Sequence, residues 1–189
     1  MKTGNIFNAK RGHPIYIIVA VDEQNGIGKN GKLPWHFKGD MEFFRETTTK
    51  TSDPKKQNMV IMGRKTWQSI PEKFRPLKNR KNVILTRDPH FKLSETKSHT
   101  SPVICHSFDE AIDLGLKDKN IENIFIIGGA QIFKEAIGYP ELTGIYLTKI
   151  HKIFDCDTFF SEIPKYLKKE KHLKQNKESE IVYDFYLIH

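Results

Sequence analysis

A single carboxylate, Asp40, stands among apolar residues in a stretch with the periodicity of an α-helix. The residues that share its helix face, at i, i+3, i+4 and i+7 spacing, are Phe37, Asp40, Met41 and Phe44. The side chains expected to point elsewhere are Glu42, Arg45 and Glu46. A charge that faces a protein core costs free energy unless a partner satisfies it. The spacing therefore favours a partly buried functional carboxylate, whose pKa burial would raise and a bound cationic donor would lower.

The alternative role for Asp40 is a helix N-cap, the commonest use of an aspartate near a helix start. Three places on, Phe43 stands where a capping box would need Glu or Gln. The apolar neighbours favour the functional interpretation, and the N-cap remains open. No second carboxylate shares this face, so a glycosidase-type acid pair is not indicated.

Two predicted strand ends carry cationic side chains. The strand 59–62 runs into the sequence GRKT at 63–66, where free backbone N–H groups and a helix dipole favour an anion. The strand 83–85 runs into Thr86-Arg87, at the carboxyl end where α/β sheets place ligands. The first does not fit a P-loop, and each alone is also compatible with a turn or an ordinary surface arginine. Together they predict a ligand with separated phosphates.

Paired glycines lie between a third apolar strand and a helix predicted at 130–137. Gly128 and Gly129 allow a ligand close approach to the backbone and tolerate unusual torsions. The dinucleotide fingerprint GxGxxG is absent because Ala130 and Phe133 occupy the later glycine positions. A tight strand-to-helix turn is the alternative.

The elements that would position these groups follow from the apolar pattern. Strands are predicted at 15–21, 59–62, 83–85, 103–105, 124–127, 145–148 and 181–187. Helices are predicted at 38–48, 65–69, 108–116 and 130–137, with Ser107 and Glu110 forming a capping box, and exposed loops at 50–58 and 88–102. Most strands are apolar at every position, which is typical of parallel strands covered on both faces. The last run is less uniform and predicts an antiparallel edge strand. We expect one α/β domain with a mostly parallel central β-sheet, an antiparallel C-terminal strand and flanking helices.

The composition is that of a globular protein with an excess of positive charge. The chain has 189 residues, 38% of them apolar and 29% charged, with 31 Lys and Arg against 23 Asp and Glu. A net charge of +8 invites a nucleic-acid interpretation. Much of the excess lies in one late stretch without the interleaved aromatics of a stacking platform: Lys165, Lys168, Lys169, Lys171, Lys174 and Lys177. A solvated face is favoured, no nucleic-acid partner is expected, and a basic nucleic-acid-binding module is the alternative of a different class.

The sequence predicts a cytoplasmic protein that has no membrane-spanning segment and no metal site. The longest apolar run, 15–21, is far short of the roughly 20 residues needed to span a bilayer. The first fourteen residues lack the apolar core of a signal peptide. Cys105 and Cys156 lie far apart without a CxxC or His partner, so two reduced thiols are expected. The histidines show no metal-ligand spacing, and no metal site is expected.

Several segments, taken in order, carry a family resemblance. They are Val19-Ala20-Val21, GIGKNG at 26–31, Leu33-Pro34-Trp35, VIMGRKTW at 60–67, SIP at 69–71, RPL at 75–77, LTR at 85–87, IGG at 127–129 and DTFF at 157–160. With this order and spacing the chain resembles a dihydrofolate reductase from residue 15 to about 187. The resemblance implies a reductase domain at 15–189 after an N-terminal extension at 1–14.

The resemblance implies NADPH-dependent reduction of 7,8-dihydrofolate to tetrahydrofolate, which supplies one-carbon metabolism. Hydride would pass to pterin C6 with protonation at N5. Asp40 matches the carboxylate that binds the pterin and promotes this protonation, while Trp35 and Thr148 match residues that orient the acid and its water. Leu33 belongs to the same catalytic set. Arg80 would pair with the α-carboxylate of the glutamate tail, a bidentate task suited to guanidinium.

Two sets of binding residues carry over on the matching motifs. The substrate set is Ile18, Val19, Leu33, Asp40, Met41, Phe44, Ile70, Leu77, Arg80, Ile127 and Thr148. The cofactor set is Ala20, Ile27, Gly63, Arg64, Lys65, Thr66, Leu85, Thr86, Arg87, His106, Ile127, Gly128, Gly129, Ala130, Gln131, Ile132 and Phe133. Arg64 and Arg87 suit a 2′-phosphate and hence NADPH over NADH, a cis Gly128–Gly129 bond is implied, and segment 26–35 would close over nicotinamide and pterin.

Three residues depart from the family pattern: Phe133 lacks a common tyrosine hydroxyl, Met41 replaces Phe or Leu, and His106 replaces a basic or small polar residue. The expected partners are dihydrofolate and antifolate inhibitors, and a monomer is expected. Some relatives are fused to thymidylate synthase, and no such fusion is expected because the chain ends at His189. The second enzyme candidate is a related reductase of a pyrimidine intermediate in flavin synthesis. Arg80 and the spacing from Leu33-Pro34-Trp35 to Asp40 favour dihydrofolate reductase.

Overall fold

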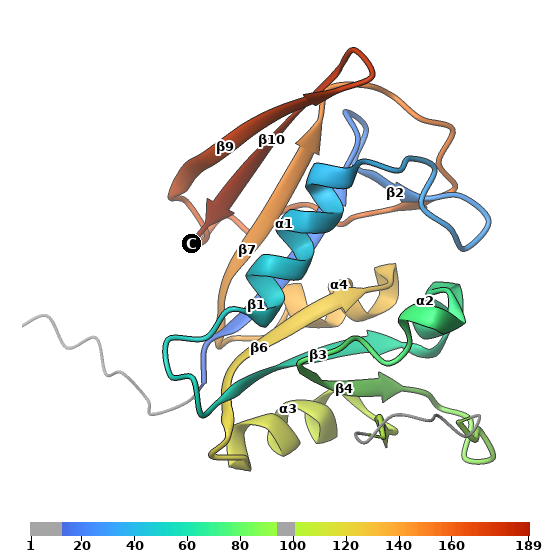
Figure 1. The fold of residues 1–189 in the computed structure, drawn as a ribbon, viewed down its shortest axis with the longest axis vertical. Coiled ribbons are helices and arrows are strands. Elements are labelled where there is room, and N and C mark those ends of the chain that lie inside the picture. Colours follow the sequence, from blue (N-terminus) through green and yellow to red (C-terminus); the bar gives the residue numbers. More distant parts are fainter. Residues whose placement is uncertain (1–12, 94–100) are drawn as a thin grey trace, which may run out of the picture.

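Eight strands form one sheet at the centre of the molecule, in a computed structural model that describes residues 13–93 and 101–189 (Figure 1). In order across the sheet they are β5 (Val103–Cys105), β4 (Arg80–Leu85), β3 (Gln57–Gly63), β6 (Ile121–Gly128), β1 (Ile15–Val21), β7 (Leu142–Ile150), β10 (Ile181–Ile188) and β9 (Glu170–Glu178). The strands from β5 across to β7 in this order pair in parallel, whereas β10 pairs antiparallel with both of its neighbours, β7 and β9. This confirms the predicted single α/β domain with a mostly parallel sheet. Residues 1–12 of the expected extension and 94–100 of the expected loop lie outside the described part.

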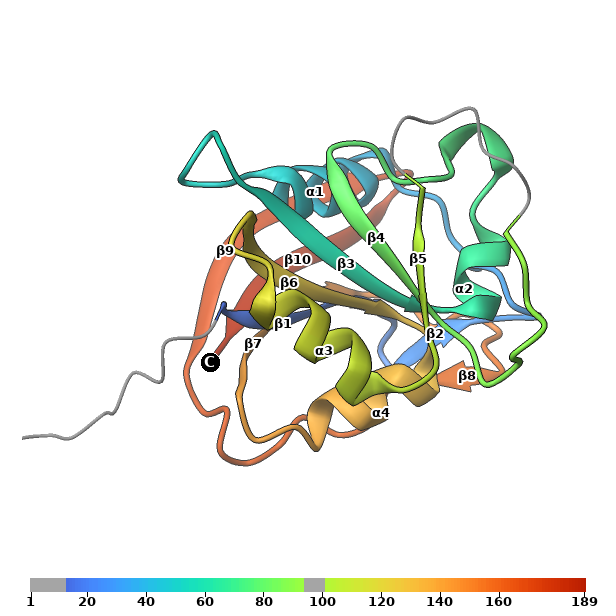
Figure 2. The same ribbon diagram turned by 90° about the horizontal axis from the view of Figure 1, so that it is seen from below.

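Helices cover both faces of the sheet (Figure 2). One face carries α1 (Lys38–Thr49) and α2 (Arg64–Ser69), and the other carries α3 (Phe108–Lys117) and α4 (Ala130–Ile137). Neighbouring strand residues alternate between the two cores: Ile18 packs in the cluster with Trp67 of α2, while Ile17 packs in the cluster with Ile112 of α3. Because water reaches neither face of the central strands, apolar residues fill every position of β1, positions 59–62 of β3 and positions 124–127 of β6.

The antiparallel end of the sheet differs from the prediction in one respect. Strand β10 lies between β7 and β9, so the expectation that it forms the edge was wrong. The strand at this edge is β9, whose sequence EKHLKQNKE is polar except for Leu173 and is mostly exposed. Part of the Lys-rich stretch therefore forms a strand. Lysines suit such an edge because they discourage pairing with another chain.

Further strand residues fall in segments predicted as loops. Gln57 and Asn58, expected in the loop 50–58, begin β3. The Asn58 side chain is buried, and its Nδ2 donates to the carbonyls of Thr48 (3.1 Å) and Lys50 (2.9 Å), which ties the end of α1 to the sheet. A second small sheet pairs β2 (Gly26–Gly28) with β8 (Thr158–Phe159) and braces the segment 26–35.

Helices α1, α3 and α4 begin at the residues predicted from the sequence, and α2 begins one residue earlier, at Arg64. Helix α1 begins at Lys38 as predicted, and Phe37 occupies its N-cap position. Asp40 is the third helical residue, which excludes the N-cap interpretation. The Ser107 hydroxyl accepts from the Glu110 backbone N–H at 3.1 Å, whereas the Glu110 carboxylate accepts from the N–H of His106. The capping box thus closes one residue earlier than its usual form.

Three further findings concern the thiols, the helices and the metal-binding side chains of the described residues. Cys105 and Cys156 are free thiols. None of the helices in 13–93 and 101–189 is long and apolar enough to cross a membrane. In the same residues, no group of three or more His, Cys, Asp or Glu side chains is arranged to hold a metal ion.

Candidate active site

A cleft of about 2300 Å³ runs along the edge at which strands β1, β3, β4 and β6 end. Ligands of α/β sheets bind at this edge because connecting loops and helix starts surround it. Every site residue predicted from the sequence lines the cleft. They are Ile18, Val19, Ala20, Ile27, Leu33, Trp35, Asp40, Met41, Phe44, Gly63, Arg64, Lys65, Thr66, Ile70, Leu77, Arg80, Leu85, Thr86, Arg87, His106, Ile127, Gly128, Gly129, Ala130, Gln131, Ile132, Phe133 and Thr148.

Asp40 is the buried acid of this cleft. Only 8% of the residue is exposed, and no cation pairs with its carboxylate among the described residues. Burial raises its pKa from near 3.8 to about 6, a hydrogen bond from the Thr148 hydroxyl opposes this rise, and the charge of Glu178 adds to it. A pKa of about 6 places the protonation equilibrium of Asp40 within reach of neutral pH, and the direction of the change is the one that burial was expected to cause.

Trp35 presents a buried donor close to the cleft. Its indole packs on Phe154 with ring centroids 5.1 Å apart, and its Nε1 has no hydrogen-bond partner among the described residues. A buried indole N–H normally has a partner, so this donor is available to a ligand or water. Leu33 and Met41 lie at the cleft mouth, 52% and 43% exposed.

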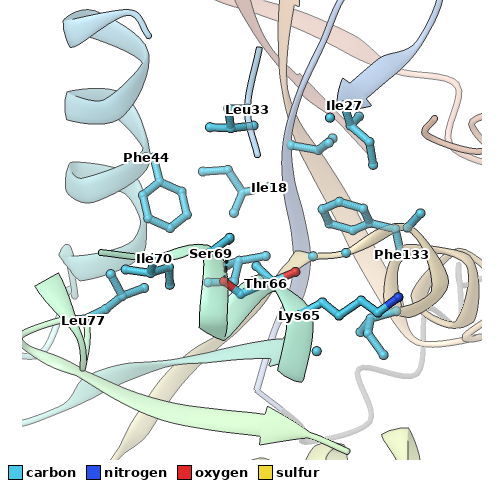
Figure 3. Close-up of a pocket in the computed structure, with 18 of the residues that line it drawn as sticks. Ile18, Ile27, Leu33, Phe44, Lys65, Thr66, Ser69, Ile70, Leu77 and Phe133 are labelled. Atoms are coloured by element: carbon cyan, nitrogen blue, oxygen red, sulfur yellow. Dashed lines mark hydrogen bonds between the residues drawn. The ribbon is translucent and has the colours of Figure 1, made fainter. Parts of the chain in front are cut away.

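The cleft has two chemically different ends. Figure 3 shows Phe44 from α1 with Ile70 and Leu77 at one end, which gives that end an apolar wall. The other end holds Lys65 and Phe133, near Ile27 of the small sheet (Figure 3). Apolar walls suit a flat ring system, since they exclude water from it.

Arg80 lies at the apolar end and has no carboxylate partner among the described residues. Its side chain is almost buried; Nη1 donates to Thr48 Oγ1 at 2.7 Å and Nε to the Lys78 carbonyl at 3.0 Å. The guanidinium also lies 5.8 Å from the Phe44 ring centroid. Burial lowers its pKa to about 10, and the nearby positive charge of Arg45 adds to this effect. A buried cation that lacks a counterion is suited to an anionic group of a ligand.

The other end gathers glycines and cations. The Gly128–Gly129 peptide is cis, as the resemblance implied, and Gly128 has a φ of 125°, which only glycine adopts readily. A Cβ atom at Gly129 would lie 3.2 Å from Thr66 Oγ1, so glycine also keeps the turn open. Arg64 pairs with Asp88 at 3.3 Å, and both side chains are partly exposed.

The comparisons with known proteins agree with one another. A sequence model of the family described as dihydrofolate reductase matches residues 14–189. A dihydrofolate reductase of Drosophila melanogaster is 43% identical over 148 residues, which cover 78% of this chain and 79% of that protein. One of Heliothis virescens is 42% identical over 151 residues, or 79% of this chain and 80% of that protein.

The chain belongs to the dihydrofolate reductase family. It also matches the bifunctional dihydrofolate reductase-thymidylate synthase 2 of Arabidopsis thaliana, with 42% identity over 164 residues that cover 85% of this chain. The chain spans 28% of the length of that bifunctional relative.

The structure shows the contacts of two residues that depart from the dihydrofolate reductase pattern, Phe133 and His106. Phe133 is buried and packs edge-on against Phe160, with centroids 5.3 Å apart. His106 Nδ1 lies 3.0 Å from the carbonyl of Thr86, so its ring is tied to a cationic strand end.

Sequence reasoning missed several residues that line the cleft: Ser69, Lys73, Phe74 and Lys78. It also expected Glu42 and Arg45 to point elsewhere, whereas both line the cleft mouth. The helical period placed these two residues on a solvent-exposed face, and both side chains are exposed in the structure. The helical period alone does not indicate that a cleft opens beside this exposed face of α1.

We predict that Asp40→Asn stabilises the ligand-free protein at neutral pH. The unfolded chain titrates this acid near its ordinary value, whereas the folded chain holds it with a pKa of about 6. The carboxylate therefore destabilises the fold increasingly between about pH 4 and 6. The neutral isostere should raise the free energy of unfolding by roughly 1–3 kcal/mol above pH 6 and leave it unchanged below about pH 4.

Urea unfolding at a series of pH values measures this gain. The control is Asp113→Asn, which removes an exposed acid of α3 that pairs with Lys117. An equal gain from Asp40→Asn at acid and neutral pH would contradict the prediction.

Proposed function

We propose that this chain reduces 7,8-dihydrofolate to 5,6,7,8-tetrahydrofolate with NADPH, and so supplies one-carbon metabolism. The observation that carries the proposal is the buried Asp40 carboxylate, with its pKa near 6, beside an apolar wall in a cleft of about 2300 Å³. Membership of the dihydrofolate reductase family supports the same reaction.

The substrate's pterin ring would bind between the apolar wall and Asp40. The ring's amino group and adjacent N–H would donate to the two carboxylate oxygens, which gives the charged acid the partners it lacks. Thr148 holds one oxygen through its hydroxyl, and the free Trp35 N–H would hold a water beside the acid. Asp40 would then promote protonation at N5, and the carbon that accepts hydride is C6.

The residues at the other end fit a nicotinamide dinucleotide. Lys65, Thr66, Thr86 and Arg87 offer cations and hydroxyls, and helix α4 presents free backbone N–H groups beside Gly129. When bound, NADPH supplies the hydride. Arg64 and Arg87 are suited to the 2′-phosphate that distinguishes NADPH from NADH. Ala20, Ile27 and Phe133 would exclude water around the nicotinamide.

Arg80 would hold the glutamate tail of the substrate. Its Nη1 and Nε positions are fixed by Thr48 and Lys78, so its remaining N–H donors would bind the α-carboxylate in a bidentate manner. Ile70 and Leu77 would contact the benzoyl ring between Arg80 and the pterin.

Other features of the proposal concern the whole chain. Residues 15–189 would constitute the reductase domain and 1–14 an N-terminal extension. A monomer in the cytoplasm would bind diaminopyrimidine or pteridine antifolates at Asp40, since these ligands present an amidine-like donor pair. The free Cys105 and Cys156 thiols accord with a reducing compartment.

The direct test is the loss of NADPH absorbance when dihydrofolate is added to purified protein. We expect turnover with NADPH, slower turnover with NADH, and inhibition by a pteridine antifolate. No turnover with either cofactor would overturn the proposal.

We predict that Asp40→Asn slows the reaction at pH 7 by about 100-fold or more, because loss of a positioned acid typically costs 10²–10⁴ in rate. The defect should shrink toward pH 5, where solvent can protonate the substrate. Rates measured from pH 5 to 9 check this, with Asp113→Asn as control. A near-normal rate at pH 7 would show that Asp40 has another role.

We predict that Arg80→Lys raises the KM for dihydrofolate about tenfold, since lysine keeps the charge but loses the bidentate geometry. The matched measurement uses a dihydropterin that lacks the glutamate tail, whose KM should not change. If both KM values rise equally, Arg80 supports the cleft instead of binding the tail.

A further inference from the structure

Glu178, the last residue of β9, caps the start of helix α1 from the other end of the chain. Its Oε2 accepts from the Lys38 backbone N–H at 2.9 Å, and its Oε1 accepts from the Gly39 N–H at 2.8 Å. A helix start leaves such N–H groups without intrahelical partners, and here the N-cap residue Phe37 has no side-chain acceptor. A carboxylate at this position also interacts favourably with the positive end of the helix dipole.

Tyr183 of β10 holds Glu178 in place. Its buried hydroxyl donates to Glu178 Oε1, and its ring stacks on Phe37 with centroids 5.0 Å apart. Burial and the hydrogen bond to Glu178 raise the pKa of Tyr183 to about 12, so the phenol remains a donor at neutral pH. The same hydrogen bond, with those from the Gly39 and Lys38 backbones, lowers the pKa of Glu178, which keeps it charged.

Gly39 allows the hairpin of β9 and β10 to approach the helix this closely. A Cβ atom at this position would lie 2.6 Å from the Tyr183 hydroxyl and 3.1 Å from Glu178 Oε1, and it would also meet the amide of Asn176. The contact between the helix start and the hairpin therefore requires glycine at position 39.

This cap bears on Asp40, the third residue of α1. In a capping box, a Glu or Gln at this position turns back and accepts from the backbone N–H of its own N-cap residue. Asp40 instead faces Thr148 and the cleft, and the helix start receives its anion from β9. We propose that Glu178 is a positioning residue for Asp40, because it caps α1 and leaves the Asp40 carboxylate free for substrate. This inference rests on the proposed reductase function.

The charge of Glu178 also reaches Asp40. The groups that face the acid are Thr148 on β7, Glu178 on β9 and Tyr183 on β10, with Lys38 beside Glu178 on the helix itself. The negative charge of Glu178 raises the pKa of Asp40, in the same direction as burial. Removing this charge while the fold persists should therefore lower the pKa of Asp40.

The variant that tests the proposal is Glu178→Gln, which keeps the size and one carbonyl acceptor but loses the charge. We expect the Asp40 carboxyl, followed by carbon-13 NMR in the ligand-free protein, to titrate about half a pH unit lower. The pH profile of kcat/KM should shift to lower pH by the same amount. On the high-pH side of the profile, kcat/KM should therefore fall about threefold, and on the low-pH side it should change little.

The matched control is Glu180→Gln, in the same hairpin turn. Its carboxylate pairs with Lys177 at 2.7 Å, and no hydrogen bond or ion pair joins it to α1 in the described structure, so we expect wild-type titration and pH profile. A folded Glu178→Gln protein with wild-type titration, or with an equal loss of rate at every pH, would overturn the proposal.

A second variant covers the case in which Glu178→Gln does not fold. Glu178→Asp keeps the charge but shortens its reach, so the pH midpoint should stay within about 0.2 units of wild type while kcat falls about two- to fivefold. A wild-type kcat in this variant would overturn the proposal. Because the NMR titration needs no turnover, it remains informative even if the protein proves not to reduce dihydrofolate.

Discussion

Burying one carboxylate without a cationic partner constrains the rest of this molecule. Asp40 keeps its place because the first turn of α1 is fixed from two directions, by Thr148 on β7 and by the hairpin of β9 and β10. The ring of Phe37 completes this support by stacking on Tyr183. Since the helix start cannot relax, the acid cannot turn to solvent, and its raised pKa is a property of the surrounding fold.

The parallel sheet accounts for the second end of the cleft. Three strands, β3, β4 and β6, end side by side, so the turns that follow them bring Arg64, Arg87 and Gly128 to one edge. These residues lie far apart in the sequence, yet each lies at the carboxyl end of its strand or within two residues beyond it. The acid end depends on antiparallel strands added beyond β7. The two chemical halves of the cleft thus derive from two different parts of one sheet.

The sequence predicted what burial dictates. Strand β1 was found at its exact bounds because apolar residues fill all its positions, and Asp40 stood out because it broke an apolar face. Strand β9 was missed because an exposed edge strand needs no apolar residues. The short strand Gly26–Gly28 was missed because its pairing with Thr158–Phe159 depends on tertiary contact alone. Glu178 gave no signal either, since its role as a cap depends on residues about 140 positions away.

Two charges and one donor in the cleft are left unmatched in the described structure: the Asp40 carboxylate lacks a cation, Arg80 lacks a counterion and Trp35 Nε1 lacks an acceptor. Each costs folding free energy, because a buried charge without a counterion, or a buried donor without an acceptor, loses hydration that the protein does not fully replace. The cost is tolerable because a wide apolar core and the tied ends of α1 hold the cleft open. A ligand that pairs with both charges, together with a water on Trp35 Nε1, would therefore regain more free energy than its contact area alone would give. Under the proposed function, the donor pair of the pterin and the α-carboxylate of the glutamate tail would supply the partners of the two charges, so the same groups that weaken the fold would favour that substrate.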